Sequence, residues 1–438
     1  MSKRFLQIFI ILAAIAAMAG SSVARNYEIN LYGASAQYLV WNEQARDFLQ
    51  NVVGCTGIKY TGDGKLGITM GTKGADTYII RYTAKASYDG IYACKGQVPP
   101  PEVGGQPSCS SAGPRYRDMI DESLVSEADW ADHTIDPATT PKKCCIVTVG
   151  ASDVAGETFS QYSEGQLKGH LGGGWVTRNL QPIDTTGLIY HRPLVVPFGF
   201  FANNALAYNP SALHTEYDPN NVTNLTRLQA VLIFSGQASM WTDFCPWPPC
   251  WWPIPWPPIW WPRHFVKPSI YPEKYIVRCM RHAGSGTHAT LHAAVMRGDW
   301  PLVTSESEST FFNDGSSDMM KCIEQNAGYD GEIAAAVGYA DADQGCGPNT
   351  SYPTTYQLTY QGAPANKYTI ALGVYDFWSA QWLYECYTRG QDTALDALHA
   401  QFFTYADSHL PASKANFWAN KTEMTVEKAT DWSYPGRI

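Results

Sequence analysis

The feature that most constrains the fold of this 438-residue chain is the alternation of predicted strands with predicted helices. Residues 27–32 alternate as a strand does, Gly33 ends that strand, and residues 36–53 carry apolar side chains at helical spacing. A strand at 275–280 leads in the same way into a helical segment at 288–296. Strands that alternate with helices predict an α/β chain whose sheets are mainly parallel.

The remaining elements are expected at intervals along the same pattern. We expect further strands at 76–83, 144–149, 194–208, 334–339 and 368–374, and further helices at 225–234, 377–387 and 392–407. The stretch 96–141 is rich in Pro, Gly, Ser and charged residues, so we expect it to be an inserted surface loop.

One segment does not follow the alternation. Residues 246–262 contain eight prolines and six tryptophans. So many prolines can propagate neither a helix nor a sheet ladder, and they favour a loop in the polyproline-II conformation. Tryptophans on such a stiff loop fit a contact surface for a partner, a glycan or a membrane interface. The alternative is a loop that folds back over an apolar patch of the protein.

The N-terminus has the features of a secretory signal peptide. Lys3 and Arg4 precede a short apolar stretch, and Ser22-Val23-Ala24 has the small-x-small pattern of a cleavage site. We therefore expect residues 1–24 to be removed and the mature protein to be periplasmic or secreted. No cysteine follows the predicted cleavage site, so we expect no lipid anchor.

The net charge bears on which partners the protein can bind, and the cysteine content bears on whether it forms disulfides. The formal charge is −9 and no basic run is present, which argues against nucleic-acid binding. Eleven cysteines in an exported chain indicate disulfides, with at least one thiol left over. We expect a local bridge between Cys245 and Cys250, and different partners, if any, for Cys144 and Cys145.

The run Arg281-His-Ala-Gly-Ser-Gly-Thr287 joins a predicted strand to a predicted helix. A helix N-terminus leaves backbone N–H groups without partners and carries partial positive charge, so it suits an anion. Ser285, Gly286 and Thr287 would let an anion approach closely, and Arg281 adds a permanently charged planar fork. The alternative is an ordinary serine-capped helix beside a surface arginine.

Three other turns offer hydroxyl and amide groups from distant parts of the chain. They are Gly33-Ala-Ser-Ala-Gln37-Tyr38, Ser87 before Gly90, and Gly150-Ala-Ser-Asp153. In α/β sheets, ligands sit beyond the carboxyl ends of strands, where such turns gather.

Taken together, the four motifs resemble those of the periplasmic phosphate-binding proteins of ABC-type uptake systems. The resemblance implies a two-lobed periplasmic-binding-protein-like fold (type II), each lobe a mainly parallel sheet flanked by helices, with the ligand cleft between the lobes. It implies that residues 25–197 form lobe 1, completed by 345–438, and that residues 198–344 form lobe 2. The implied partners are inorganic phosphate or a similar oxyanion and an ABC-type membrane permease, with no cofactor, no metal and a monomeric protein.

The same resemblance implies the ligand-binding residues. They are Gln37, Tyr38, Ser87, Asp153, Arg281, Ser285, Gly286 and Thr287. A buried carboxylate repels a dianion unless a proton lies between them. Hydrogen phosphate carries such a proton and sulfate does not, so Asp153 would select phosphate.

The chain departs from the family pattern at two places. Family members usually have Thr and an aromatic residue where Gln37 and Tyr38 stand, and an aspartate where Ala283 stands. Arg281 is therefore either freer than in the family or anchored elsewhere, and the preferred anion is left open.

Three alternative interpretations concern other features of the sequence or other roles for the same residues. The fold could serve a surface or partner-interaction role through residues 246–262, with a degenerate anion site. Ser285 could be the nucleophile of a secreted hydrolase, but its surroundings lack the first glycine of a nucleophile elbow, so we expect no enzyme. His288 and His292 stand four apart, as a metal pair could, although a plain helix face is the preferred explanation of the spacing.

Overall fold

The computed structural model describes residues 24–100, 109, 111–169, 172–206, 222–244, 274–326, 334–387 and 389–438. The predicted signal peptide up to Val23, the Trp/Pro-rich segment and the expected Cys245–Cys250 bridge lie outside the described residues.

The first of two large sheets has the strand order β10-β18-β7-β1-β4-β3-β2. Its central strand β1 (Asn26–Gly33) pairs in parallel with β4 (Asp76–Ala84) and β7 (Val149–Ser152). The outer strands β2 (Thr56–Gly62), β3 (Leu66–Lys73), β10 (Tyr190–His191) and β18 (Trp382–Glu385) pair antiparallel.

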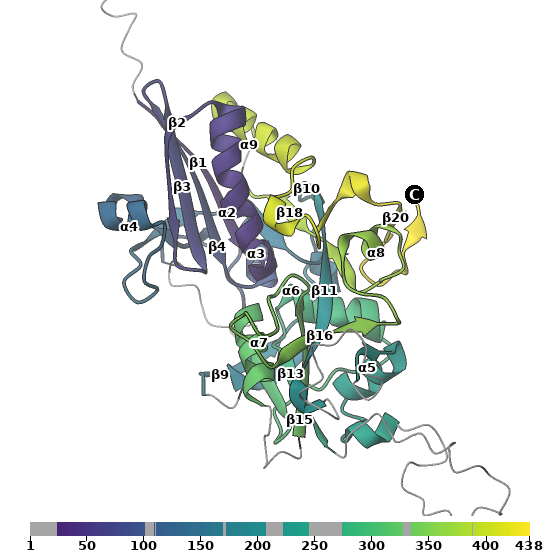
Figure 1. Cartoon of the computed structure of the whole chain (residues 1–438). Coiled ribbons are helices and arrows are strands. Elements are labelled where there is room, and N and C mark those ends of the chain that lie inside the picture. Colours follow the sequence, from purple (N-terminus) through teal and green to yellow (C-terminus); the bar gives the residue numbers. More distant parts are fainter. Residues whose placement is uncertain are drawn as a thin grey trace, which may run out of the picture.

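Two helices cover one face of this first sheet (Figure 1). They are α2 (Tyr38–Asp47), extended by a π-helical turn over Phe48–Val53, and α9 (Thr393–Ala406). Phe402 of α9 packs against the rings of Trp41 and Phe48, so residues more than 350 positions apart share one core. The predicted helices at 36–53 and 392–407 are confirmed.

The second sheet is built around β11 (Leu194–Asn203), which is buried along its whole length. Parallel ladders join β13 (Tyr275–Arg281) to β14 (Thr310–Asn313) and to β15 (Ala334–Asp341). β12 (Asn224–Leu225) pairs parallel with β16 (Thr355–Tyr360), while β16, β15, β17 (Trp378–Ala380) and β19 (Ala419–Asn420) pair antiparallel with β11. The prediction of parallel sheets therefore holds for the ladders of β1 with β4 and β7 and for those of β13 with β14 and β15, whereas all ladders of β11 are antiparallel.

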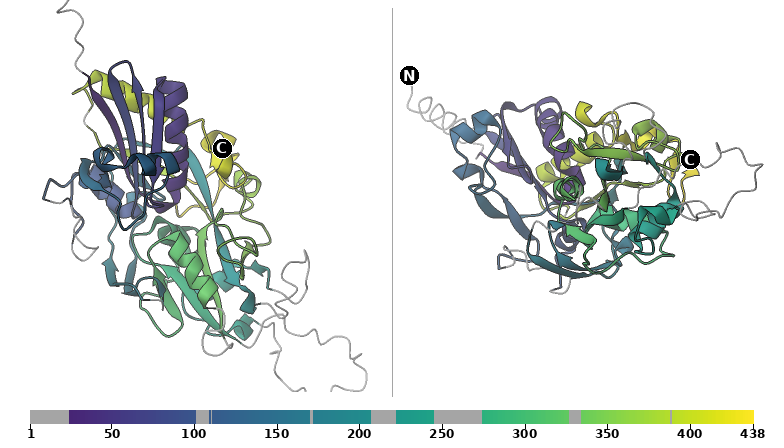
Figure 2. Two further views of the ribbon diagram at one scale, coloured as in Figure 1. Left: turned by 60° about the vertical axis from the view of Figure 1, so that its left-hand side comes forward. Right: turned by 60° about the horizontal axis from the view of Figure 1, so that its bottom comes forward.

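Helices α3 (Ser87–Cys94), α5 (Arg227–Phe234), α6 (Gly286–Thr290) and α7 (Ser316–Gln325) complete the layers. A π-helical turn over Leu291–Met296 extends α6, which confirms the predicted helical segment at 288–296. The two sheets occupy opposite halves of an elongated molecule (Figures 1 and 2).

The chain passes from the first sheet to the second between β10 and β11, and crosses back from β17 to β18. The strands on either side of residue 345, β15 and β16, both lie in the second sheet. The lobe boundaries at 197 and 345 stay predictions.

The expected surface loop at 96–141 is wrong in part, because much of it is folded. It contains β5 (Tyr116–Ile120) and the short helix α4 (Glu127–Asp132), which begins at a capping box of Ser126 and Asp129. Ile120, Val125, Trp130 and Ile135 bury their side chains against β3 and β4. β5 pairs with β6 (Lys142–Ile146), so the expected strand at 144–149 is divided between this hairpin and β7.

Two further element assignments are wrong. Residues 368–374, expected as a strand, contain α8 (Lys367–Ala371), which Asn366 and Thr369 start with a capping box. Residues 377–387, expected as a helix, form β17 and β18, because pairing with β11 and β7 overrides the local propensity.

Among the described residues, three disulfides join separate segments: Cys94–Cys386, Cys109–Cys144 and Cys279–Cys322. Cys145 is a free thiol, so the adjacent pair Cys144-Cys145 is divided between a disulfide and a thiol. None of the helices in the described part of the chain has the length and hydrophobicity that crossing a bilayer requires.

Candidate functional site

Six strand ends meet where the two sheets face each other. In the first sheet, parallel strands β4, β1 and β7 lead directly to Ser87, Ser35 and Asp153. In the second, parallel strands β13, β14 and β15 end at or just before Arg281, Ser316 and Asp341. Because parallel neighbours end at the same edge of a sheet, each sheet presents three polar side chains to the other.

Helices α3 and α6 carry this contact between the two halves (Figure 1). A Cβ atom added at Gly286 would lie 2.5 Å from both Ser87 Oγ and Asp153 Cβ. A Cβ at Gly284 would lie 2.4 Å from the ring of Tyr88. Only glycine allows the α6 turn to approach the first sheet this closely.

Arg281 lies at the centre of the site with only 2% of its surface exposed. Its Nη1 donates to Ser316 Oγ at 3.2 Å, and its Nη2 donates to the Asp314 carbonyl oxygen at 3.0 Å and to Ser35 Oγ at 3.4 Å. All three acceptors are neutral. Ala283 cannot hold the arginine as the aspartate of the family pattern would, and these three groups hold Arg281 instead. Among the described residues, no carboxylate is in direct contact with Arg281.

Several buried polar atoms around Arg281 have no hydrogen-bond partner within the described ranges. They are Arg281 Nε, Asp153 Oδ1, Thr287 Oγ1 and Asp341 Oδ1. Leaving such a group desolvated and unpaired costs about 1–3 kcal/mol each. A bound molecule with both donors and acceptors would satisfy this set.

Ser285 and Ser87 each form hydrogen bonds that fix a neighbouring part of the site. Ser285 Oγ accepts from the His288 N–H and caps α6, as expected for the first turn of a helix. Ser87 Oγ donates to Asp153 Oδ2 and accepts from the Asp153 N–H, both at 3.3 Å. These bonds fix the Asp153 carboxyl group so that Oδ1 is left unpaired.

The carboxyl groups of Asp153 and Asp341 both resist ionisation. Burial, with the nearby charge of Asp341, raises the pKa of Asp153 to about 7, against the lowering effect of Arg281. Burial, with the nearby charge of Asp343, also raises the pKa of Asp341. Near neutral pH the site can therefore hold or release a proton, and its net charge changes with that proton.

Gln37 and Tyr38 lie at the edge of the site, and each already has hydrogen-bond partners within the protein. Gln37 Nε2 donates to the Ser152 carbonyl oxygen at 3.0 Å, and Gln37 Oε1 accepts from Trp41 Nε1 at 2.8 Å. The Tyr38 hydroxyl donates to the Leu66 carbonyl oxygen at 3.2 Å. A ligand contact of either residue stays a prediction, and the Gln37 NH2 group has a second N–H with which it could be made.

Ser35, Asp314, Ser316 and Asp341 were not among the residues expected from the sequence. Strand β14, which positions Asp314 and Ser316, was not predicted, because Thr310–Asn313 is only four residues long. Asp341 had a usable signal, since it lies two residues after the predicted strand at 334–339 and strand ends gather at such sites.

A pocket of about 260 Å³ opens next to Arg281, between the two halves of the molecule. Ser35, Tyr38, Lys65 and Lys85 line it from the first half. Asp314, Ser316, Asp341 and Asp343 line it from the second half.

In the part of the chain that the structure describes, His288 and His292, four apart in sequence, do not share a hydrogen-bond partner. His288 Nδ1 contacts the Tyr339 hydroxyl and His292 Nδ1 contacts Gln161 Nε2, so the two rings have separate partners, and burial lowers the pKa of each.

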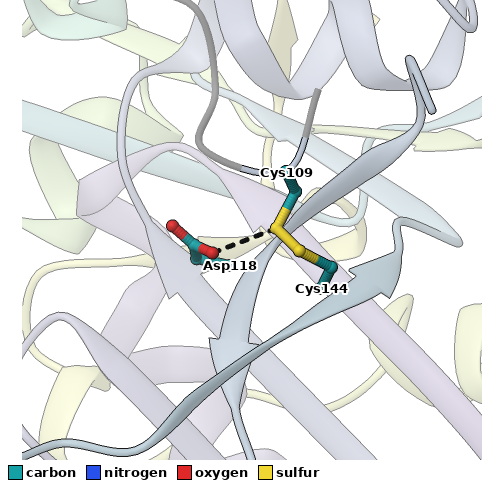
Figure 3. A group of neighbouring side chains, drawn as sticks. All are labelled: Cys109, Asp118 and Cys144. Carbon is teal, nitrogen blue, oxygen red and sulfur yellow. Dashed lines mark hydrogen bonds between the residues drawn. A yellow bond between two sulfur atoms is a disulfide. The ribbon is translucent and has the colours of Figure 1, made fainter. Parts of the chain in front are cut away.

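Asp118 Oδ1 lies 3.0 Å from Cys109 Sγ (Figure 3). Cys109 and Cys144 are joined in a disulfide, so neither sulfur offers a thiolate to a cation.

No protein-family model matches the chain, and no curated protein matches it in sequence. Several solved structures are similar to it in arrangement. One is a protein from Clostridium perfringens described as a phosphate ABC transporter substrate-binding protein, with phosphate bound: 12% identity, TM-score 0.46, 90% of this chain and 99% of that chain covered. A second is an ABC-type phosphate transport receptor from Vibrio cholerae, with 12% identity, TM-score 0.40, and 87% and 94% of the two chains covered. A third is PstS from Borrelia burgdorferi, with 8% identity, TM-score 0.36, and 86% and 92% covered.

Proposed function

We propose that this chain is an exported solute-binding protein that holds phosphate or a similar tetrahedral oxyanion between its two halves. The observation that carries the proposal is that Arg281 is buried without a negatively charged partner. Buried charges in proteins are normally paired, as Arg81 is with Glu28 and Glu122, and Arg117 with Asp89. Arg281 is equally buried, yet it has only neutral hydrogen-bond partners in the part of the chain that the structure describes.

The surrounding groups suit an oxyanion that carries a proton. Arg281 Nε and Thr287 Oγ1 can donate to anionic oxygens, and Asp153 Oδ1 can accept the proton of hydrogen phosphate. Sulfate has no such proton, so it would face a second negative charge wherever Asp153 is ionised. The expected preference is therefore phosphate over sulfate.

Binding would stabilise the closed arrangement of the two halves, because ligand groups come from both sheets. The closed form would then dock on an ABC-type membrane permease. Export agrees with the N-terminal sequence and with three disulfides, which persist in oxidising compartments.

A hydrolytic role for Ser285 has no support in its geometry. Its hydroxyl caps α6, and among the described residues no histidine ring contacts it. We therefore propose a binding protein and not an enzyme.

Titration calorimetry on protein stripped of bound anions tests the proposal. We expect phosphate to bind and sulfate to give little heat at neutral pH. Arg281→Gln should weaken phosphate binding by about 10- to 150-fold, the value of a charge-assisted hydrogen bond. Arg437→Gln, a change of the same charge at an exposed position, serves as the control.

An unfolding curve for each variant shows whether it is folded. Absence of heat with both phosphate and arsenate, from folded wild-type protein, would refute the proposal.

A further inference from the structure

The pocket beside Arg281 adjoins the proposed anion site through residues that contact Arg281. Ser35 Oγ and Ser316 Oγ accept hydrogen bonds from the Arg281 guanidinium, and both residues also line the pocket. Asp341, whose Oδ1 has no partner among the described residues, lines it as well. A group attached to an anion at Arg281 would enter the pocket past the Ser35 and Ser316 side chains.

The pocket is larger than a small inorganic anion needs. Its volume is about 260 Å³, whereas a cavity that holds one water needs about 10–15 Å³ by a comparable measure. It can hold several non-hydrogen atoms in addition to the groups around Arg281.

Two lysines line this pocket from the first half of the molecule. The Ala84 N–H donates to the Lys65 carbonyl oxygen and the Lys85 N–H to the Gly33 carbonyl oxygen, so the backbone holds both lysines at the same edge of the sheet. Neither ammonium group forms an ion pair within the ranges that the structure describes.

The acidic side chains across the pocket are already neutralised or hydrogen-bonded. Asp343 pairs with Lys414, Asp314 Oδ1 lies 3.1 Å from His282 Nε2, and Asp341 Oδ2 accepts from Ser316 Oγ at 2.9 Å. The hydrogen bond from His282, followed by nearby Lys85 and Lys65, holds the pKa of Asp314 well below its usual range. Lys65 and Lys85 are therefore the pocket cations that have no ion-pair partner within the described ranges, while each carboxylate across the pocket already has a partner of its own.

From this arrangement we infer that the ligand is a phosphate monoester that carries a second anionic group. Its phosphoryl group would lie against Arg281, Thr287 and Asp153, and its second anionic group would pair with Lys65 and Lys85. This inference rests on the proposed function, because it places the phosphoryl group in the same anion site.

Calorimetry with three probes tests the inference: inorganic phosphate, glycerol 3-phosphate and 3-phosphoglycerate. The two esters share a three-carbon skeleton and differ in whether its far end is a hydroxymethyl or a carboxylate group. We expect 3-phosphoglycerate to bind about 5- to 30-fold more tightly than glycerol 3-phosphate, the effect of two ion pairs at a partly exposed site.

A double variant, Lys65→Gln with Lys85→Gln, should abolish this preference and leave the affinity for inorganic phosphate unchanged within about threefold. Lys142→Gln with Lys321→Gln removes the same charge from two other exposed positions and should keep the preference.

The possible failures are distinguishable. Equal binding of the two esters, or a preference that survives the Lys65/Lys85 change, overturns the inference while inorganic phosphate binding keeps the proposed function intact. Absence of binding by all three probes overturns the proposed function and the inference together.

Discussion

Replacing Asp153 with asparagine removes a buried acid while keeping the size of its side chain. Burial and the nearby Asp341 raise the pKa of Asp153 from 3.8 to about 7 in the folded protein. The difference is roughly three pKa units, and each unit corresponds to 1.36 kcal/mol. Ionised Asp153 therefore costs the anion-free protein about 4 kcal/mol of folding free energy.

The sign of the pH dependence follows from proton uptake. Because the folded pKa lies above the unfolded value, the folded protein holds a proton between pH 4 and 7 that the unfolded chain has released. The contribution of Asp153 to stability is therefore present at pH 4 and lost as the pH rises to 7. An asparagine side chain never ionises, so Asp153→Asn should match wild type near pH 4 and be more stable by up to about 4 kcal/mol at pH 8.

Urea unfolding of anion-free protein at pH 4, 6 and 8 measures this difference as a free energy of unfolding. Asp407→Asn, a change at an exposed carboxylate, is the matched control and should leave the pH profile unchanged. If Asp153→Asn has the same pH profile as wild type, or is less stable at pH 8, the reasoning about this buried carboxyl group is wrong.

Three further changes test other parts of the account. Gly286→Ala places a Cβ 2.5 Å from Asp153 and should weaken phosphate binding by about 5- to 150-fold through a clash of about 1–3 kcal/mol, whereas Gly174→Ala, with open space around it, should have no effect in the same calorimetry. Asp341→Asn removes negative charge beside Arg281 and should tighten phosphate binding at pH 8 by about tenfold; weaker binding would contradict the assigned electrostatics. Replacing both Cys94 and Cys386, which are 292 residues apart in sequence, by serine should lower the free energy of unfolding by about 2–5 kcal/mol in urea, and an unchanged midpoint would mean that the bridge does not constrain the unfolded chain.

Local sequence patterns were sufficient for the parts of the fold in which each strand leads into its own helix. The strand at 27–32 and the helix at 36–53 need only their own periodicity, and the same holds for the strand at 275–280 and the helical segment after it. The turns at the ends of these strands also have local signatures, so most of the expected site residues could be placed near strand ends.

Pairing between distant segments decided the parts that sequence analysis missed. Residues 377–387 are aromatic enough to suit a helix or a strand, and only their ladders with β11 and β7 make them strands. The same is true of the 96–141 segment, whose polar composition hides four apolar residues that bury against β3 and β4.

The anchors of Arg281 could not be predicted for a related reason. Ser35, Asp314 and Ser316 reach the guanidinium only because β1 and β14 end at the facing edges of two different sheets. No spacing in the sequence connects Ser35 with Ser316. Their roles depend on sheet register and on how the two halves meet.

The central claim is that a tetrahedral oxyanion binds between Arg281 and Asp153. A crystal structure of the protein grown with arsenate, with data collected at the arsenic absorption edge, locates such an anion directly. The account predicts one strong anomalous peak within hydrogen-bond reach of Arg281, Thr287 and Asp153. A peak at another site alone, or none from protein saturated with arsenate, would contradict it.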